Sequence, residues 1–270
     1  MRRVLYFFTA IFFFQILSHN TELFSFGPRG PYTHKRITFD PFDAFSKESG
    51  FEINPICMEA IWQGNIQSDA ILGDKDVYHC DNNQIQRCSQ TFHDLLEETK
   101  KIQNHHMGLL NLGKALHILQ DFYAHSNWVE ITEGAELVAP VEEFRFYPFY
   151  GNLQSGSYPL IPIRHDIATS VEDAVDCFLK PKDQWKTFVL GATHSCMAKD
   201  SNVDFRGGEL PRLGFGKTYH EVAGVIATKH TTQFLVSLFK KRNPTLMQCL
   251  LPRTSGLSCA KTIFKTRGEL

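Results

Sequence analysis

Two histidines and an aspartate have the spacing of metal ligands in the segment Leu116–Glu130. His117, Asp121 and His125 follow one another at intervals of four residues. At about 100° per residue on a helix, each interval advances only about 40° round the axis, so the three side chains share one stripe. Imidazoles and carboxylates are ligands that zinc accepts, and a helix holds them rigidly. The segment therefore predicts a metal site to which these three side chains contribute ligands.

The residues around this polar stripe are unusually apolar for a helix on a protein surface. They are Leu116, Ile118, Leu119, Phe122, Tyr123 and Trp128. A polar stripe in such surroundings is expected to face an interior cleft rather than solvent. Metal binding is the interpretation that we favour, and a buried network of hydrogen bonds without a metal is the alternative.

The same segment reads His-Ile-Leu-Gln-Asp-Phe-Tyr-Ala-His-Ser-Asn-Trp-Val-Glu. It resembles the signature of the Het-C-related family, which includes the N-terminal region of some von Willebrand factor A domain-containing proteins. That family resembles, more distantly, the zinc-dependent bacterial phospholipases C and the fungal single-strand nucleases. The resemblance implies an all-helical, multi-helix fold in which two or three zinc ions lie between the helices.

Ligands from earlier in the chain are implied by the same resemblance. His34 lies in a Thr-His-x-x-Ile-Thr pattern, in which Thr33 is placed to cap a helix. Asp69 precedes the loop histidine His79 by ten residues, like a bridging carboxylate paired with a histidine of a second metal. Asp69 is also our candidate for the catalytic residue that orients water and accepts its proton. Asp81, two residues after His79, is expected to be a turn residue or a partner behind the ligands.

Three later residues complete the expected ligand set, and they are His194, Asp200 and His220. They occur in Thr-His, Lys-Asp-Ser and His-x-x-Ala elements that resemble the family pattern in the same order. The phospholipases close their cluster with His-x-x-x-Glu and the nucleases with His-x-x-x-Asp, whereas residues 198 and 224 here are Ala and Gly. The N-terminal Trp that binds zinc in the phospholipases is also absent from the expected start of the mature chain.

Length and composition suit one large helical domain. The chain has 270 residues, 43% of them hydrophobic, and a formal net charge of −1, which gives no overall field that attracts a polyanion. Helical patterns are expected over 55–72, over 84–128 as two long helices, and from residue 219 onward. We expect a signal peptide at 1–20, the helical domain at 21–243 and a basic tail at 244–270.

The N-terminus and the cysteines indicate a secreted protein. Arg2 and Arg3 precede an apolar run that ends at Leu17, which is too short to span a bilayer and typical of a cleaved signal. The alternative is a membrane anchor. Seven cysteines suit an oxidising compartment, and their odd number leaves one without a partner in the chain. Cys80 with Cys88 and Cys249 with Cys259 are the simplest pairs.

A zinc cluster of this kind predicts a secreted phosphodiester hydrolase, because zinc lowers the pKa of water to about 7 and neutralises phosphate oxygens. The near-neutral chain and the aromatic stretch 144–151 favour phospholipid, and contact with a membrane surface, over nucleic acid. The alternative is a metal-binding, non-catalytic interaction or toxin-like module. The sequence does not indicate an oligomeric state.

Overall fold

The structure is a computed structural model of the whole chain. It describes residues 26, 30–50, 52–72, 75–101, 104–139, 153–156, 194–204, 206–240 and 250. Several expectations lie outside these residues: the signal peptide at 1–20, the aromatic stretch 144–151, the pair Cys249–Cys259 and the basic tail 244–270. Among the described residues, no helix has both the length and the apolar character needed to cross a membrane.

The described part of the chain is all-α, as predicted. Its long helices are α2 (His34–Ser49), α3 (Pro55–Leu72), α5 (Ile85–Lys101), α6 (His105–His125) and α10 (Tyr219–Lys240), and its short helices are α4 (Asp76–His79), α7 (Trp128–Ile131) and α9 (His194–Met197). Among the described residues, an isolated antiparallel bridge joins Ser126 and Ser155. The expected helices at 55–72 and 84–128, and the helix from residue 219, are confirmed.

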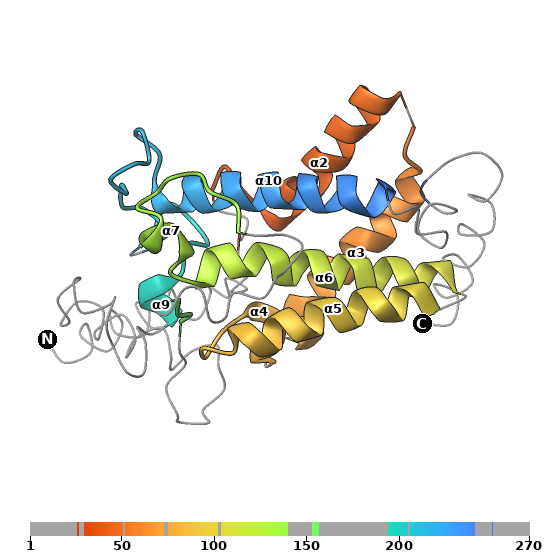
Figure 1. The fold of residues 1–270 in the computed structure, drawn as a ribbon, viewed down its shortest axis with the longest axis horizontal. Helices are drawn as coiled ribbons and strands as arrows, with labels where there is room; N and C mark the ends of the chain where they lie inside the picture. The colour runs from red at the N-terminus through yellow and green to blue at the C-terminus, as the bar shows by residue number, and fades with distance from the viewer. Residues whose placement is uncertain are drawn as a thin grey trace, which may run out of the picture.

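Helix α6 is the centre of the bundle. It runs alongside α5, with α10 on its other side and α3 crossing it, while α7 and α9 lie near its C-terminal end (Figure 1). Nearly every residue of α6 is buried, including the histidines and the aspartate of the predicted metal stripe. Because α6 is enclosed by helices, its polar stripe must face other helices rather than water.

Local signals in the sequence explain where two of the helices begin. The Thr33 side chain accepts a hydrogen bond from the Arg36 N–H at 3.1 Å, which caps α2 as predicted and makes His34 its first residue. The Asn104 side chain accepts hydrogen bonds from the His106 and Met107 N–H groups and caps α6. These caps determine the residue at which α2 and α6 begin, and so the side of each helix on which its histidines lie.

Two glycines let α3 and α6 approach closely. A Cβ atom at Gly113 of α6 would lie 2.0 Å from the Ile61 carbonyl oxygen, and one at Gly64 of α3 would lie 2.1 Å from the Leu110 carbonyl oxygen. Both contacts are with backbone atoms, which cannot move aside without shifting a helix. This close crossing brings Asn65 and Asp69 of α3 toward the polar stripe of α6.

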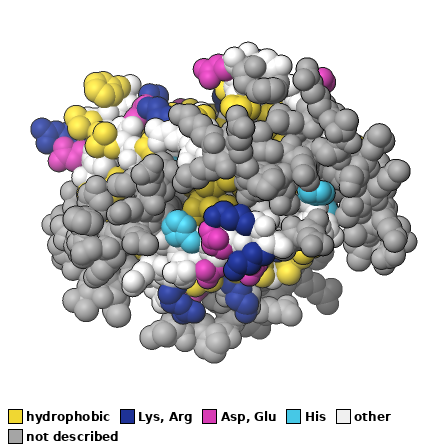
Figure 2. All heavy atoms as spheres, turned by 45° about the vertical axis from the view of Figure 1, so that its right-hand side comes forward, with side chains coloured by type: hydrophobic (Ala, Val, Ile, Leu, Met, Phe, Trp, Pro, Cys, Tyr) yellow, Lys and Arg dark blue, Asp and Glu magenta, His cyan; other side chains and the backbone are white. Residues whose placement is uncertain are grey.

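Charges of both signs are mixed over the described surface. On the face drawn in Figure 2, the Lys and Arg side chains lie beside Asp and Glu side chains rather than in separate patches. Exposed ion pairs such as Arg36–Asp40 and Arg212–Glu133 follow the same pattern. The described side chains of this face therefore agree with the near-neutral composition and form no single-sign track of the kind that binds a polyanion.

The close crossing of α3 and α6 yields a prediction for Gly113→Ala. We expect the variant to lose about 1–3 kcal/mol of unfolding free energy, because the added methyl group forces the helices apart and outweighs the better helix propensity of alanine. Urea denaturation followed by circular dichroism measures the change. Lys114→Ala, on the next, partly exposed position, is the matched control and is expected to change stability by less than about 0.5 kcal/mol. Equal stability of the two variants would contradict the close approach.

Candidate metal centre

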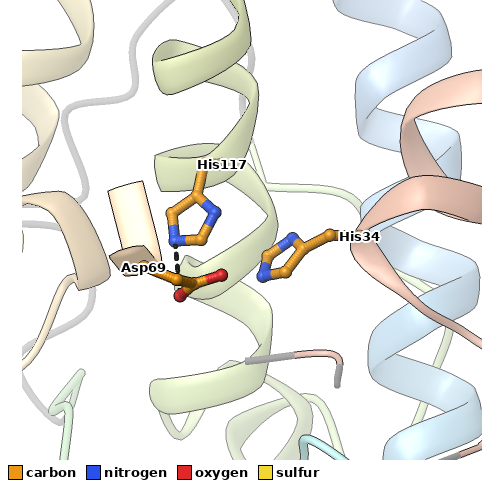
Figure 3. A group of neighbouring side chains, drawn as sticks. All are labelled: His34, Asp69 and His117. Carbon is orange, nitrogen blue, oxygen red and sulfur yellow. Dashed lines mark ion pairs between the residues drawn. The ribbon is translucent and has the colours of Figure 1, made fainter. Parts of the chain in front are cut away.

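Five buried side chains from α2, α3, α4 and α6 meet inside the bundle. We call this cluster the first centre, and it consists of His34, Asp69, His79, His117 and Asp121. Figure 3 shows His34 reaching from α2 and Asp69 from α3 toward His117 of α6. One possible ligand atom from each of these three residues lies within 4.8 Å of the others. The predicted residues therefore come together, although they are far apart in the sequence.

Asp121 is the carboxylate that the histidines of the first centre share. Its Oδ2 lies 2.8 Å from His79 Nδ1 and 3.0 Å from His117 Nε2. Its Oδ1 lies 3.1 Å from His34 Nε2, on the opposite side. The Asp121 side chain is fully buried, so all of its compensating positive charge must come from these neighbours or from a bound cation.

A second cluster lies at the C-terminal end of α6, and we call it the second centre: Asp81, His125, His194 and Asp200. His125 Nε2 lies 3.2 Å from Asp200 Oδ1, and the rings of His125 and His194 are 4.4 Å apart. His79 connects the two centres, because its side chain belongs to the first and its carbonyl oxygen lies 3.0 Å from His125 Nδ1. The predicted ligands His125, His194 and Asp200 are thus brought together.

The hydrogen-bond partners determine which nitrogen most of these histidines turn toward the centres. A carbonyl oxygen only accepts, so His125 Nδ1 must carry the proton that it donates to the His79 carbonyl. In the same way, His34 Nδ1 donates to Gln120 Oε1 at 2.6 Å and His117 Nδ1 lies 3.4 Å from Asn65 Oδ1. In the neutral rings the Nε2 lone pairs then face the carboxylates, as metal binding requires.

Three polar residues behind the first centre were not singled out by the sequence: Thr38, Asn65 and Gln120. The Gln120 amide donates to Thr38 Oγ1 at 2.9 Å, and the Asn65 amide donates to Gln120 Oε1 at 3.3 Å. These bonds orient both amide groups so that their oxygens accept from the histidines. Sequence signals did exist, because Asn65 precedes Asp69 by one helical turn and Gln120 lies inside the signature segment.

Burial and charge act against each other in the first centre. Burial opposes the charged form of Asp121, but His117, His34 and His125 outweigh it and hold the pKa of Asp121 well below its usual value. Burial raises the pKa of Asp69 to about 7, and the neighbouring His34 opposes this rise. Burial lowers the pKa of His117 to about 3, which keeps this imidazole neutral. Burial opposes the charged forms of His34 and His79, but Asp121 outweighs it and raises the pKa of both. His117 is thus the histidine of this centre that burial keeps neutral, as a metal ligand must be.

The second centre is dominated by its carboxylates. Burial favours neutral His125, yet Asp81, Asp200 and Asp121 raise the pKa of His125 well above its usual value. The pKa of Asp81 is lowered, because His125 and His194 outweigh the effect of its burial. The carboxylates thus demand a nearby positive charge, which either a proton on His125 or a metal ion can supply.

The donor set fits divalent metal ions. The side chains of Asp69, Asp81 and Asp121 are almost fully buried, and that of Asp200 is only 18% exposed. His79 Nε2 is also buried and has no hydrogen-bond partner among the residues that the structure describes. His117 Nε2 and His79 Nδ1 face each other at 3.2 Å, an arrangement that needs a proton or a cation between the two nitrogens. Imidazole with carboxylate suits zinc and similar transition metals.

His220, the remaining predicted ligand, contacts backbone groups beside the two centres. Its Nδ1 donates to the Lys199 carbonyl oxygen at 2.8 Å, and its Nε2 faces the Tyr32 N–H at 3.4 Å. Because both ring nitrogens face backbone groups, His220 joins none of the candidate metal groups among the described residues. Its contact with Lys199 supports the backbone next to Asp200, and its predicted role as a ligand stays a prediction.

Short anchored segments hold the ligands that come from loops. His79, Cys80 and Asp81 are consecutive, and a disulfide joins Cys80 to Cys88 of α5, as predicted. Lys199 is fully buried, and its Nζ contacts Glu130 of α7 at 3.3 Å and the Met197 carbonyl oxygen at 2.7 Å. Its N–H also donates to the Ala124 carbonyl oxygen at the end of α6. These contacts fix Asp200, the next residue, beside His125.

Comparison with known proteins identifies one related family over part of the chain. Residues 45–141 match the family model described as VWA7 N-terminal domain. The match supports a VWA-related N-terminal domain in this region, which contains Asp69, His79, His117, Asp121 and His125 and excludes His34, His194 and Asp200. No curated protein and no solved structure matches the chain. The likeness to Het-C proteins, phospholipases C and nucleases stays a prediction.

The shared position of Asp121 yields a prediction for Asp121→Ala. The variant is expected to bind less zinc and to melt at a lower temperature than the wild type in zinc-containing buffer, because metal binding contributes to folding free energy. Inductively coupled plasma mass spectrometry gives the zinc content, and calorimetry gives the melting temperature. Asp40→Ala, which removes an exposed acid of α2, is the control. Unchanged zinc content in Asp121→Ala would exclude Asp121 as a ligand.

The disulfide beside the centres yields a second prediction. The double variant Cys80→Ala/Cys88→Ala is expected to lose roughly 2–3 kcal/mol of stability and also to bind zinc more weakly, because Cys80 lies between His79 and Asp81. Zinc affinity is measured by competition with a chromophoric chelator. A stability loss without weaker zinc binding would show that the disulfide does not position the centres.

Proposed function

We propose that this protein is a secreted, zinc-dependent phosphodiester hydrolase. The observation that carries the proposal is the pair of adjacent buried histidine–carboxylate centres. The first centre is enclosed by helices, and the second includes the less buried loop residue Asp200. Zinc ions held in such centres would lower the pKa of water to about 7 and neutralise the charge of phosphate oxygens. The α6 signature is expected to be of the Het-C-related type, and the more distant resemblance of that family to the zinc-dependent phospholipases and nucleases favours the same chemistry.

The two centres suit different roles. The first centre offers five protein side chains, enough to fill a tetrahedral zinc shell without water. The second centre offers fewer ligands, and the side chain of Asp200 is 18% exposed whereas that of Asp121 is fully buried. A catalytic zinc keeps a coordination position for water. The second centre therefore suits substrate approach. The first suits an ion enclosed by His34, His79, His117 and Asp121, which leaves Asp69 at its edge.

Asp69 is the proposed catalytic residue. Its carboxylate lies at the edge of the first centre, with Oδ1 3.5 Å from His117 Nε2 and 4.0 Å from His79 Nδ1. Unlike Asp121, it is not held by several histidines at short distance, so one oxygen is available to orient water and accept its proton. Its pKa of about 7 suits a group that gains and loses a proton near neutrality.

Phospholipid is the substrate class that we favour. The loop between Asp200 and His220 carries exposed apolar side chains, with Val203, Leu210 and Phe215 exposed to 76%, 66% and 90%. The loop starts at a residue of the second centre, so lipid contact there would bring a headgroup toward the site. Exposed apolar side chains suit a lipid interface better than a polyanion, which would require a basic surface.

A non-catalytic metal-binding interaction module is the second candidate. It is favoured by the enclosed first centre, because a structural zinc normally has four protein ligands and no water. In that case zinc would stabilise the crossing of α2, α3 and α6 and would have no part in turnover. The match to a VWA-related N-terminal domain does not distinguish this role from hydrolysis.

The hydrolase proposal is tested by assays on zinc-loaded and chelator-treated protein. We expect release of phosphorylated headgroups from phosphatidylcholine vesicles, loss of this activity with chelator, and recovery with zinc. Asp69→Asn is expected to lower kcat by about 10²- to 10⁴-fold, and Glu59→Gln, an exposed acid on the same helix, is the control. Cleavage of single-stranded oligonucleotides alone would redirect the substrate class. Stoichiometric zinc without cleavage of either substrate would favour the non-catalytic module.

A further inference from the structure

Asp81 is a buried carboxylate of the second centre whose part in the site is separate from that of the predicted ligands. It is 1% exposed and directly follows the disulfide-bonded Cys80. Its N–H donates to the Asp76 carbonyl oxygen at 3.0 Å, and its own carbonyl accepts from the Gln84 N–H at 2.9 Å. The backbone on both sides of Asp81 is therefore fixed, and so is the direction of its side chain.

A single oxygen of Asp81 contacts two histidines. Asp81 Oδ1 lies 3.0 Å from His194 Nδ1 and 3.3 Å from His125 Nδ1. The two imidazoles come from α9 and α6, segments that are about seventy residues apart in the chain. Asp81 is thus the group through which the orientations of these two rings are coupled.

The tautomer of His125 shows on which side of its ring an ion can bind. His125 Nδ1 also faces the His79 carbonyl oxygen at 3.0 Å, and a carbonyl oxygen cannot donate. His125 Nδ1 therefore carries a proton and is not available to a metal. Its Nε2 points to the other side, toward Asp200 Oδ1 at 3.2 Å. An ion of the second centre must then lie on the Asp200 side of the ring, away from Asp81.

We propose that Asp81 is a positioning residue that holds the Nδ1–H groups of both His125 and His194, so that both rings offer Nε2 to one zinc ion together with Asp200. This inference rests on the metal binding in the proposed function but not on hydrolysis. A carboxylate behind a metal-bound histidine fixes the ring and makes the facing nitrogen a stronger ligand. One such carboxylate here serves two ligands.

Two histidines of the first centre are held from behind by groups of a different kind. There, His34 and His117 are held from behind by the neutral amide oxygens of Gln120 and Asn65. A neutral acceptor orients the ring but adds no negative charge. Loss of Asp81 should therefore weaken the second centre and leave the first centre, with its own acceptors, largely intact.

The wild-type protein tests the geometry directly. Nitrogen-15 NMR of the zinc-loaded chain, with His125 and His194 assigned through His→Gln variants, reports which ring nitrogen binds the ion. We expect Nε2 to be bound and Nδ1 to be protonated in both rings. Binding through Nδ1 in either ring would overturn the proposal, and so would the absence of bound zinc at these histidines.

The variant Asp81→Asn tests the energetic part of the proposal. Its amide keeps the size of the side chain and one acceptor oxygen but carries no negative charge, so it is a weaker acceptor for both Nδ1–H groups. We expect zinc affinity of the second centre to fall by about 10- to 100-fold, while zinc in the first centre and the circular dichroism spectrum stay unchanged. Asp76→Asn, a partly exposed acid in the same segment, is the control. Unchanged zinc affinity at both centres in Asp81→Asn would overturn the proposal.

Zinc binding and hydrolysis are measured separately in these experiments. If the wild type binds zinc through the expected nitrogens but cleaves no phosphodiester, the hydrolase proposal fails and the role of Asp81 stands. If the wild type hydrolyses vesicles but Asp81→Asn binds zinc as tightly as the wild type, the role of Asp81 fails alone.

Discussion

The concentration of buried negative charge at the C-terminal half of α6 is the constraint on which the rest of the structure depends. Asp121 is fully buried, and Asp69, Asp81 and Asp200 lie in the adjoining centres. Removing carboxylates from water costs far more free energy than an ordinary hydrogen bond returns, unless opposite charge is close. The surrounding histidines supply that charge only when protonated, and protonated histidines would repel one another at these distances. Divalent cations resolve the conflict, because one ion compensates two carboxylates and leaves the histidines neutral.

The helices are packed in the way that this cluster requires. Asp69 reaches the α6 stripe because Gly64 and Gly113 remove the side chains that would keep α3 and α6 apart. His34 is available because a threonine cap starts α2 at that residue. The loop ligands are held covalently or by buried ion pairs, through Cys80 and through Lys199. Rigid support of this kind is what allows ligands from distant segments to keep a fixed geometry.

The sequence was sufficient to predict the helices and most residues of the site, for reasons that are local. Apolar periodicity and a capping threonine are properties of neighbouring residues, so the helix over 55–72 and the start of α2 could be predicted. The i, i+4 spacing placed His117, Asp121 and His125 on one side of α6. The roles of Asn65 and Gln120 could not be predicted, because an amide behind a histidine is recognisable only once two helices are placed together. The contacts of His220 could not be predicted for the same reason: its partners, the Lys199 carbonyl and the Tyr32 N–H, are backbone groups that no side-chain motif reveals.

Helix α6 contributes ligands to both centres, and the two centres differ in how deeply they are buried. His117 and Asp121 are enclosed by α2, α3 and α4, whereas His125, one turn further, meets the ends of segments that lead into the loop after Asp200. Burial therefore decreases along one stripe whose ligand types stay the same. In the enclosed first centre, a bound ion would stabilise the crossing of α2, α3 and α6 and would keep a positive charge at a fixed position in the site. At the less buried end, the side chain of Asp200 is 18% exposed. A single rigid helix keeps the two candidate centres at a constant separation, which the proposed joint action of two ions on one phosphodiester would require.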